Sequence, residues 1–130
     1  IFFLGTEGGN TAIGLGYHAD GYSSILFSTW GDDWYEGNNE ADPMVPHHYL
    51  ITYDGSASAL ALYVDGIYRD TLNVSVDIGT LRRIGQGNDA AMQSMYQWVG
   101  AFWSFRAYNR VLTRNEISAL AAEFAPASQS

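Results

Sequence analysis

Residues 59–72 read Ala-Leu-Ala-Leu-Tyr-Val-Asp-Gly-Ile-Tyr-Arg-Asp-Thr-Leu, which places a strand-forming run on each side of an Asp-Gly pair. In the first run, apolar side chains recur at every second position, the period of a strand with one buried face. Asp65-Gly66 suits the left-handed backbone dihedrals of a two-residue type I′ turn. The stretch therefore predicts a β-hairpin that joins strands 59–64 and 67–72.

The same period of two continues along the rest of the chain, where glycines and turn residues separate short apolar runs. The last of these runs is apolar on both faces, which is typical of a central strand. Together the runs predict further strands near residues 1–4, 12–18, 22–28, 48–53, 81–85 and 98–108.

A single helix is predicted near the C-terminus. Thr113 and Glu116 have the spacing of a capping box, in which each side chain accepts a backbone amide hydrogen at the helix start. From Ile117 onward, apolar residues recur at i, i+3, i+4 and i+7, the stripe of a helix that lies on a sheet, and Pro126 ends the pattern. The expected fold is an all-β, antiparallel β-sandwich with one short C-terminal helix.

Composition excludes several classes of partner. The chain has 130 residues, enough for one domain, and no apolar run near the roughly 18 residues of a membrane span. Its net charge of −8, with six arginines and no lysine, would repel nucleic acid. There is no cysteine for a disulfide or thiolate site. We expect no nucleic-acid partner and no membrane insertion.

Four stretches carry a family resemblance. His48-Tyr49-Leu50-Ile51-Thr52-Tyr53-Asp54-Gly55 is followed by Leu62-Tyr63-Val64-Asp65-Gly66, by Ile84-Gly85 and by the terminal run 100–112. In this order they resemble the signature strands of laminin-G-like domains, over roughly residues 47–120. The resemblance implies a jelly roll of the concanavalin A-like lectin-glucanase superfamily, with a distant similarity to the pentraxins.

The start of the chain departs from the family pattern. The opening strand of the family has no counterpart, because the chain begins with Ile1-Phe2-Phe3-Leu4. The resemblance therefore implies that residues 1–125 are a laminin-G-like domain without its first strand or strands, and residues 126–130 a linker or tail. An open sheet edge recruits another strand. We expect an upstream segment or a neighbouring subunit to complete the sheet.

A long connection between residues 30 and 43 is the main candidate for ligand binding, because long loops in compact domains are often functional. It combines aromatic rings, which stack on sugars, with carboxylates and amides, which hydrogen-bond sugar hydroxyls. In the alternative, its tryptophans cap the sandwich core. The predicted ligand-binding residues are Asp32, Asp33, Trp34, Tyr35, Asn38 and Asn39.

Calcium is the cofactor that the resemblance suggests, because pentraxins bind it with loop oxygens. The corresponding oxygen ligands here are Asn10, Asn88 and Asp89, while glycine stands at two acidic ligand positions, which predicts a weak site. In the alternative, these residues bind no calcium and simply form turns, since their residue types tolerate left-handed dihedrals. Asn73-Val74-Ser75 is a glycosylation sequon, with Asn73 as the acceptor if the protein is secreted by a eukaryote.

No catalytic residues are predicted. Retaining glucanases of this fold need Glu-x-Asp-x-x-Glu on one strand, and the nearest match, Glu40-Ala41-Asp42-Pro43-Met44-Val45, lacks its last carboxylate and contains a proline. His47 and His48 are adjacent, so on a strand they face opposite sides and cannot chelate a metal as a pair. One of them is expected to be buried and hydrogen-bonded.

Together these features predict a non-catalytic carbohydrate-binding or adhesion module of a larger protein. Its expected location is extracellular, or the surface of a cell or virus particle, and its expected partner is a glycan or an extracellular protein. The alternative is a structural or assembly domain of a filament, virion or surface layer that binds no glycan.

Overall fold

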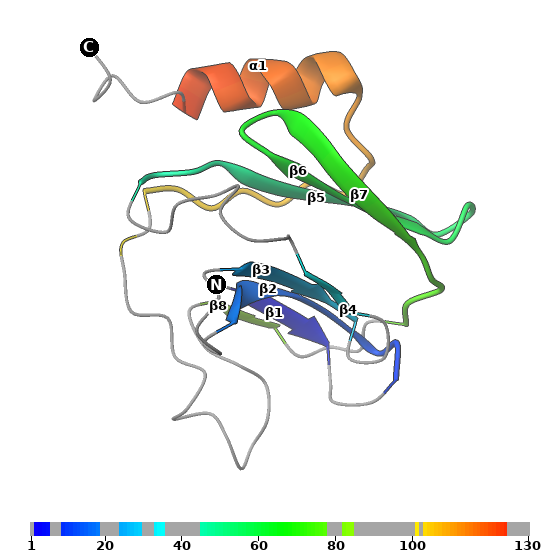
Figure 1. The fold of residues 1–130 in the computed structure, drawn as a ribbon. Helices are drawn as coiled ribbons and strands as arrows, with labels where there is room; N and C mark the ends of the chain where they lie inside the picture. The colour runs from blue at the N-terminus through cyan, green and yellow to red at the C-terminus, as the bar shows by residue number, and fades with distance from the viewer. Residues whose placement is uncertain are drawn as a thin grey trace. The chain divides into compact units, whose positions relative to one another are not determined.

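In the part of the chain that it describes, the computed structural model shows antiparallel β-strands and one helix (Figure 1). It divides into two compact units, residues 1–41 with 74–106 and residues 42–73 with 107–130. The residues that it describes are 2–5, 9–18, 24–29, 33–35, 45–77, 82–84, 101 and 103–124.

The first unit contains a five-stranded sheet with the strand order β4-β3-β2-β1-β8. All of its pairings are antiparallel. The central strand β2 supplies Ala12, Ile13 and Leu15, each at most 3% exposed, as expected for a strand with a neighbour on either side. The strands are β1 (Phe2–Gly5), β2 (Ala12–His18), β3 (Ser24–Ser28), β4 (Asp33–Tyr35) and β8 (Arg82–Ile84).

The second unit contains a three-stranded antiparallel sheet and the helix α1 (Arg114–Phe124). In the middle strand β6, Leu60, Leu62 and Val64 are fully buried while the residues between them are half-buried. This alternation is the period of two read from the sequence. The strands are β5 (Tyr49–Asp54), β6 (Ala59–Val64) and β7 (Ile67–Asn73).

The hairpin between β6 and β7 has the turn that the sequence predicts. Asp65 and Gly66 have φ values of 53° and 80°, and Val64 pairs with Ile67. Gly66 also lies close to α1, because a Cβ atom at this position would be 2.9 Å from the Cβ of Ala121. Glycine thus satisfies both a left-handed backbone and a close approach to the helix.

The prediction of a central strand near residues 98–108 is wrong where the structure describes this segment. Residues 103–108 form no strand, and Trp103 and Phe105 are 75% and 48% exposed. The apolar pattern shows which side chains gain from burial. It does not show that a neighbouring strand is available to form a ladder, which a strand also requires.

Candidate functional site

The predicted ligand-binding segment contains a strand that the sequence analysis missed. Asp33, Trp34 and Tyr35 form β4, which pairs with β3 at one edge of the five-stranded sheet. A long loop was therefore the wrong description of these three residues. The sequence pattern did not indicate this strand, because it has only three residues and polar residues flank it. The other predicted ligand-binding residues, Asp32, Asn38 and Asn39, lie outside the described residues, as do Glu40 and Asp42.

Asn10, a predicted calcium ligand, lies at a junction within the first unit. It has a φ of 59°, and its side-chain Oδ1 accepts a hydrogen bond of 2.8 Å from Oγ1 of the buried Thr29. Its backbone N–H donates to the carbonyl oxygen of Thr29, and its carbonyl oxygen accepts from the N–H of Asp77. These contacts tie the turn before β2 to the end of β3.

The other two predicted calcium ligands, Asn88 and Asp89, lie outside the described residues. Within the part of the chain that the structure describes, no group of three or more His, Asp or Glu side chains could hold a metal ion. The calcium site therefore stays a prediction. Asn73, the sequon asparagine, is exposed at the end of β7 and is followed by the buried Val74.

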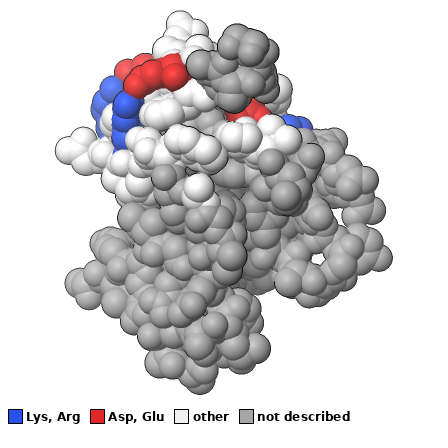
Figure 2. Space-filling model, turned by 90° about the vertical axis from the view of Figure 1, so that its left-hand side faces the viewer, with Lys and Arg blue, Asp and Glu red and all other residues white. Residues whose placement is uncertain are grey.

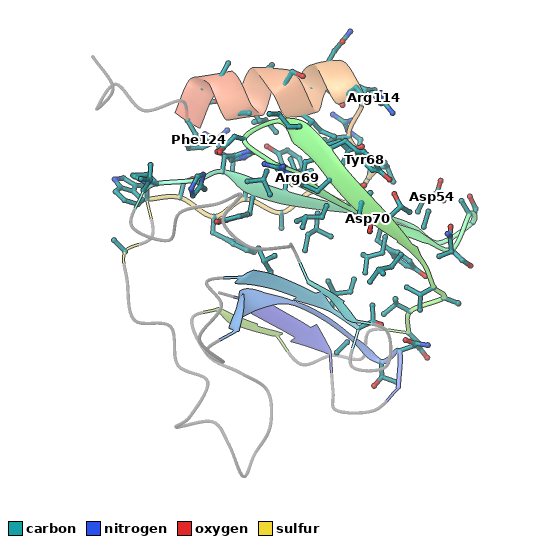
Figure 3. All side chains as sticks on the ribbon, in the orientation of Figure 1. Asp54, Tyr68, Arg69, Asp70, Arg114 and Phe124 are labelled. Atoms are coloured by element: carbon teal, nitrogen blue, oxygen red, sulfur yellow. The ribbon has the colours of Figure 1, made fainter. Side chains whose placement is uncertain are left out.

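His47 and His48 precede β5, and each contacts another part of the second unit. The Nδ1 atom of His47 is 2.7 Å from Oδ2 of Asp65, while the N–H of His48 donates to Oδ1 of the same carboxylate. The His48 ring stacks on the Phe124 ring, with centroids 5.3 Å apart. Phe124 is the last residue of α1 (Figure 3). Both histidines therefore connect the hairpin turn and the helix to the start of β5.

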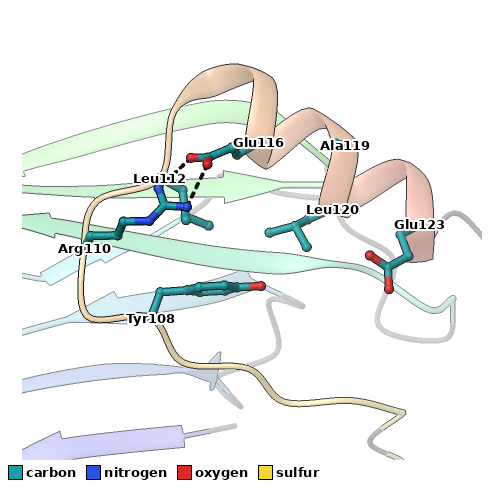
Figure 4. A pocket seen from close by; sticks show the side chains of 7 residues that line it. All are labelled: Tyr108, Arg110, Leu112, Glu116, Ala119, Leu120 and Glu123. Carbon is teal, nitrogen blue, oxygen red and sulfur yellow. Dashed lines mark hydrogen bonds and ion pairs between the residues drawn. The ribbon is translucent and has the colours of Figure 1, made fainter.

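A small open groove lies beside α1 in the second unit (Figure 4). Its volume is about 280 Å³, and its lining combines one aromatic ring, leucine and alanine side chains, one guanidinium and two carboxylates. The sequence predicts only a helix cap in this region, because the residues that line the groove come together only in the folded chain. The lining residues are Tyr108, Arg110, Leu112, Glu116, Ala119, Leu120 and Glu123.

An ion pair closes one end of this groove. Arg110 donates from both terminal nitrogens to the two oxygens of Glu116, at 2.8 and 2.7 Å. The Glu116 carboxylate also accepts the N–H of Thr113, while the Thr113 hydroxyl accepts the N–H of Glu116, which is the predicted capping box. In the space-filling view, described acidic and basic side chains lie side by side at the upper left, and a second, smaller group of both signs lies farther right (Figure 2).

These contacts lower the pKa of Glu116 to about 2, chiefly through the hydrogen bonds from Arg110 and then through the backbone N–H of Thr113. A carboxylate with a lowered pKa stabilises the folded state above its ordinary value of 4.5, and this contribution is lost as the pH falls toward 2. The start of α1 should therefore keep its cap at pH 4.

We expect carboxyl NMR titration to place the Glu116 midpoint far below 4.5, and Arg110→Gln to raise it toward that value because the guanidinium donors are lost. In parallel, the stability difference between the wild type and Glu116→Gln should shrink between pH 4.5 and pH 2. A wild-type midpoint near 4.5 would contradict the ion pair.

Comparisons with known proteins place the chain in a family. A family model described as the concanavalin A-like lectin/glucanases superfamily matches residues 1–118. This match confirms the resemblance to laminin-G-like and concanavalin A-like domains, and the antiparallel strands with one short helix confirm the fold class. Among the curated proteins, none matches the chain.

No helix within the described ranges is long and apolar enough to cross a membrane.

One solved structure is similar, a crystal structure of an S-layer domain-containing protein from Clostridium thermocellum. The sequences are 20% identical, the TM-score is 0.47, and the match covers 93% of this chain. The chain spans 61% of the length of that structure.

Proposed function

The chain belongs to the concanavalin A-like lectin/glucanases superfamily, and on this basis we propose that it is a non-catalytic carbohydrate-binding or adhesion module of a larger extracellular or surface protein. The family match over residues 1–118 is the observation that carries the proposal. A fold of this kind accommodates binding and catalysis alike, so the choice between them rests on the residues present. The incomplete acid pattern at residues 40–45 favours binding.

The proposed ligand site is the acidic, amide-rich and aromatic segment around β4. β4 is an edge strand, paired with β3 through Phe27 and Trp34, so Asp33, Trp34 and Tyr35 lie at an edge of their sheet. Sugar sites combine aromatic faces with carboxylates and amides, and these residue types occur together here. Asp32, Asp33, Trp34, Tyr35, Asn38 and Asn39 are the proposed ligand-binding residues, and the proposed cofactor is a weakly bound calcium ion at Asn10, Asn88 and Asp89.

We expect Trp34→Ala or Tyr35→Ala to weaken glycan binding by about tenfold, the scale of one lost aromatic contact. Successive strand positions belong to opposite faces of a sheet, so we expect the two substitutions to reduce glycan affinity by different amounts. Binding would be measured on a glycan array and then by calorimetry, with and without millimolar calcium. Asn73→Ala, at an exposed position in the other unit, is the matched control.

The melting temperatures of these variants separate a binding role from a core role. Loss of binding with a melting temperature within about 5 °C of the wild type supports the site, since about 1 kcal/mol corresponds to such a change in a domain of this size. A larger decrease for either variant would assign that residue to the core instead.

The second candidate function is assembly into a filament, virion or surface layer without a glycan ligand. Large apolar side chains that are 75% exposed at Trp103, 48% at Phe105 and 44% at Val111 favour it, because exposed apolar surface often marks contacts between subunits. Sedimentation of the chain over a range of concentrations tests this alternative. Self-association together with a glycan array that shows no bound sugar would replace the first proposal with the second.

A further inference from the structure

The groove beside α1 combines an aromatic ring with apolar side chains. The Tyr108 ring is 47% exposed and lies below Leu120 in the close-up of the groove (Figure 4). Leu112, which is buried, and the half-buried Leu120 provide the apolar part of the lining. An exposed aromatic ring beside apolar surface suits a ligand that has a flat apolar face of its own.

The ion pair at one end of the groove supplies hydrogen-bonding groups. Arg110 donates one N–H from each terminal nitrogen to Glu116, and a guanidinium has further N–H groups besides these two. The Oε1 atom of Glu116 accepts the bond from one of these nitrogens, and a carboxylate oxygen has a second lone pair. Both side chains are partly exposed, 56% for Arg110 and 39% for Glu116, so a ligand can reach them. Because the two charges already pair with each other, an uncharged ligand with hydroxyl groups suits them.

The size of the groove limits the ligand to about one ring. Its volume of about 280 Å³ lies just below the roughly 300–1,000 Å³ of sites for drug-sized ligands. A pyranose sugar has a flat face of C–H groups that stacks on aromatic rings, and hydroxyl groups around its rim that both donate and accept hydrogen bonds. The aromatic, apolar and paired polar parts of the lining match these features of one sugar ring.

We propose that this groove binds one uncharged pyranose residue of a glycan. The C–H face of the sugar stacks on the Tyr108 ring, and its hydroxyl groups bond to Arg110 and Glu116. The inference rests on the proposed carbohydrate-binding function and adds a sugar site in the second unit to the one proposed around β4. Contact with a single small ring predicts a Kd on the order of 1 mM, because the binding free energy per ligand atom is limited.

The test is a backbone-amide NMR titration of the 130-residue chain with the methyl glycosides of glucose, galactose, mannose and N-acetylglucosamine. At least one glycoside should cause saturable shifts of amides within residues 108–120. Sorbitol, which has hydroxyl groups but no ring, should cause none there. Saturable shifts confined to residues 33–35 would refute the groove and leave the proposed function standing. No saturable shift with any glycoside would also refute the groove, and only an empty glycan array in addition would refute the proposed function.

Two tyrosines of nearly equal exposure separate the groove from the rest of the surface. Tyr108→Ala should raise the Kd of the tightest-binding glycoside by about 3- to 10-fold, the range expected for loss of one aromatic contact. Tyr108→Phe keeps the ring and should change the Kd by less than about twofold. Tyr68→Ala removes a tyrosine that is 46% exposed on β7 and outside the groove lining, and its effect should also be less than about twofold. Equal weakening by Tyr108→Ala and Tyr68→Ala would refute the site.

Arg110→Lys tests the polar end of the groove independently of the ring. It keeps the positive charge but loses the planar set of donors, so the Kd should rise by about threefold or more. The melting temperatures of both groove variants should stay within about 5 °C of the wild type, so that a weaker affinity reports on the site. An unchanged Kd in Arg110→Lys and Tyr108→Ala together would place the bound glycoside elsewhere and overturn the proposal.

Discussion

Leu62→Ala is expected to lower the free energy of unfolding by about 2–5 kcal/mol, a large part of the 5–15 kcal/mol typical of a domain. Leu62 is 0% exposed in the middle strand of the three-stranded sheet, between the equally buried Leu60 and Val64. Truncation removes apolar area and leaves a cavity that flanking strands on both sides prevent from collapsing fully. In urea, the unfolding midpoint should fall by about 1–2 M.

Leu72→Ala is the matched control for this prediction. It makes the same chemical change on β7, where Leu72 is only half-buried and pairs with Leu60. Its effect should be about half as large, because less apolar area is withdrawn from water at that position. Equal effects of the two substitutions would mean that β6 does not form the centre of the core in its unit.

Much of the fold could be predicted from the period of the apolar residues. β2 and β6 begin and end at the residues that the sequence predicts, because each has a strong alternation bounded by turn residues. The capping box fixed the start of α1 equally well, since Thr113 and Glu116 act on each other over three residues. Such local rules need no knowledge of distant contacts.

The predictions that failed concern features that depend on residues distant in the sequence. Residues 103–108 carry four apolar side chains, at positions 103, 105, 107 and 108, which favours a strand. Strand pairing, however, depends on a neighbour that the segment itself does not specify. β4 was missed because three residues are too few to show a period. The same limit applies to the groove beside α1, where Tyr108 and Glu123 are 15 residues apart in sequence and line one groove only in the folded chain.

Of the predicted site residues, Asp33, Trp34 and Tyr35 share one edge strand, and Asn10 has a structural role at a turn. The φ of Asn10 is 59°, a left-handed backbone conformation that asparagine tolerates better than most residue types, so the turn alternative accounts for an asparagine at this position. Spacing along the sequence identified residue types that can bind sugar or calcium. Spacing does not show which of these residues lie close together in the folded chain, because that depends on tertiary contacts.

Gly66→Ala is expected to destabilise the chain by about 2–4 kcal/mol. Gly66 has a φ of 80°, where a side chain costs about 1–2 kcal/mol. In addition, the new Cβ would be 2.9 Å from the Cβ of Ala121, which is too close for two carbon atoms and forces α1 or the hairpin to shift. The measurement is urea unfolding followed by far-ultraviolet circular dichroism.

Three further variants separate the two causes. Gly55→Ala is the matched control, because a Cβ there would make only an ordinary contact of 3.7 Å with Tyr53, and its effect should be within about 0.5 kcal/mol. Gly66→Asn tolerates the left-handed dihedral yet retains the steric conflict, so it should lose less stability than alanine but more than Gly55→Ala. Adding Ala121→Gly to Gly66→Ala should relieve the conflict with the helix, although glycine itself costs about 1 kcal/mol there. A double-mutant cycle without coupling between positions 66 and 121 would show that the hairpin and α1 are not in contact, and the strain would then lie in the turn alone.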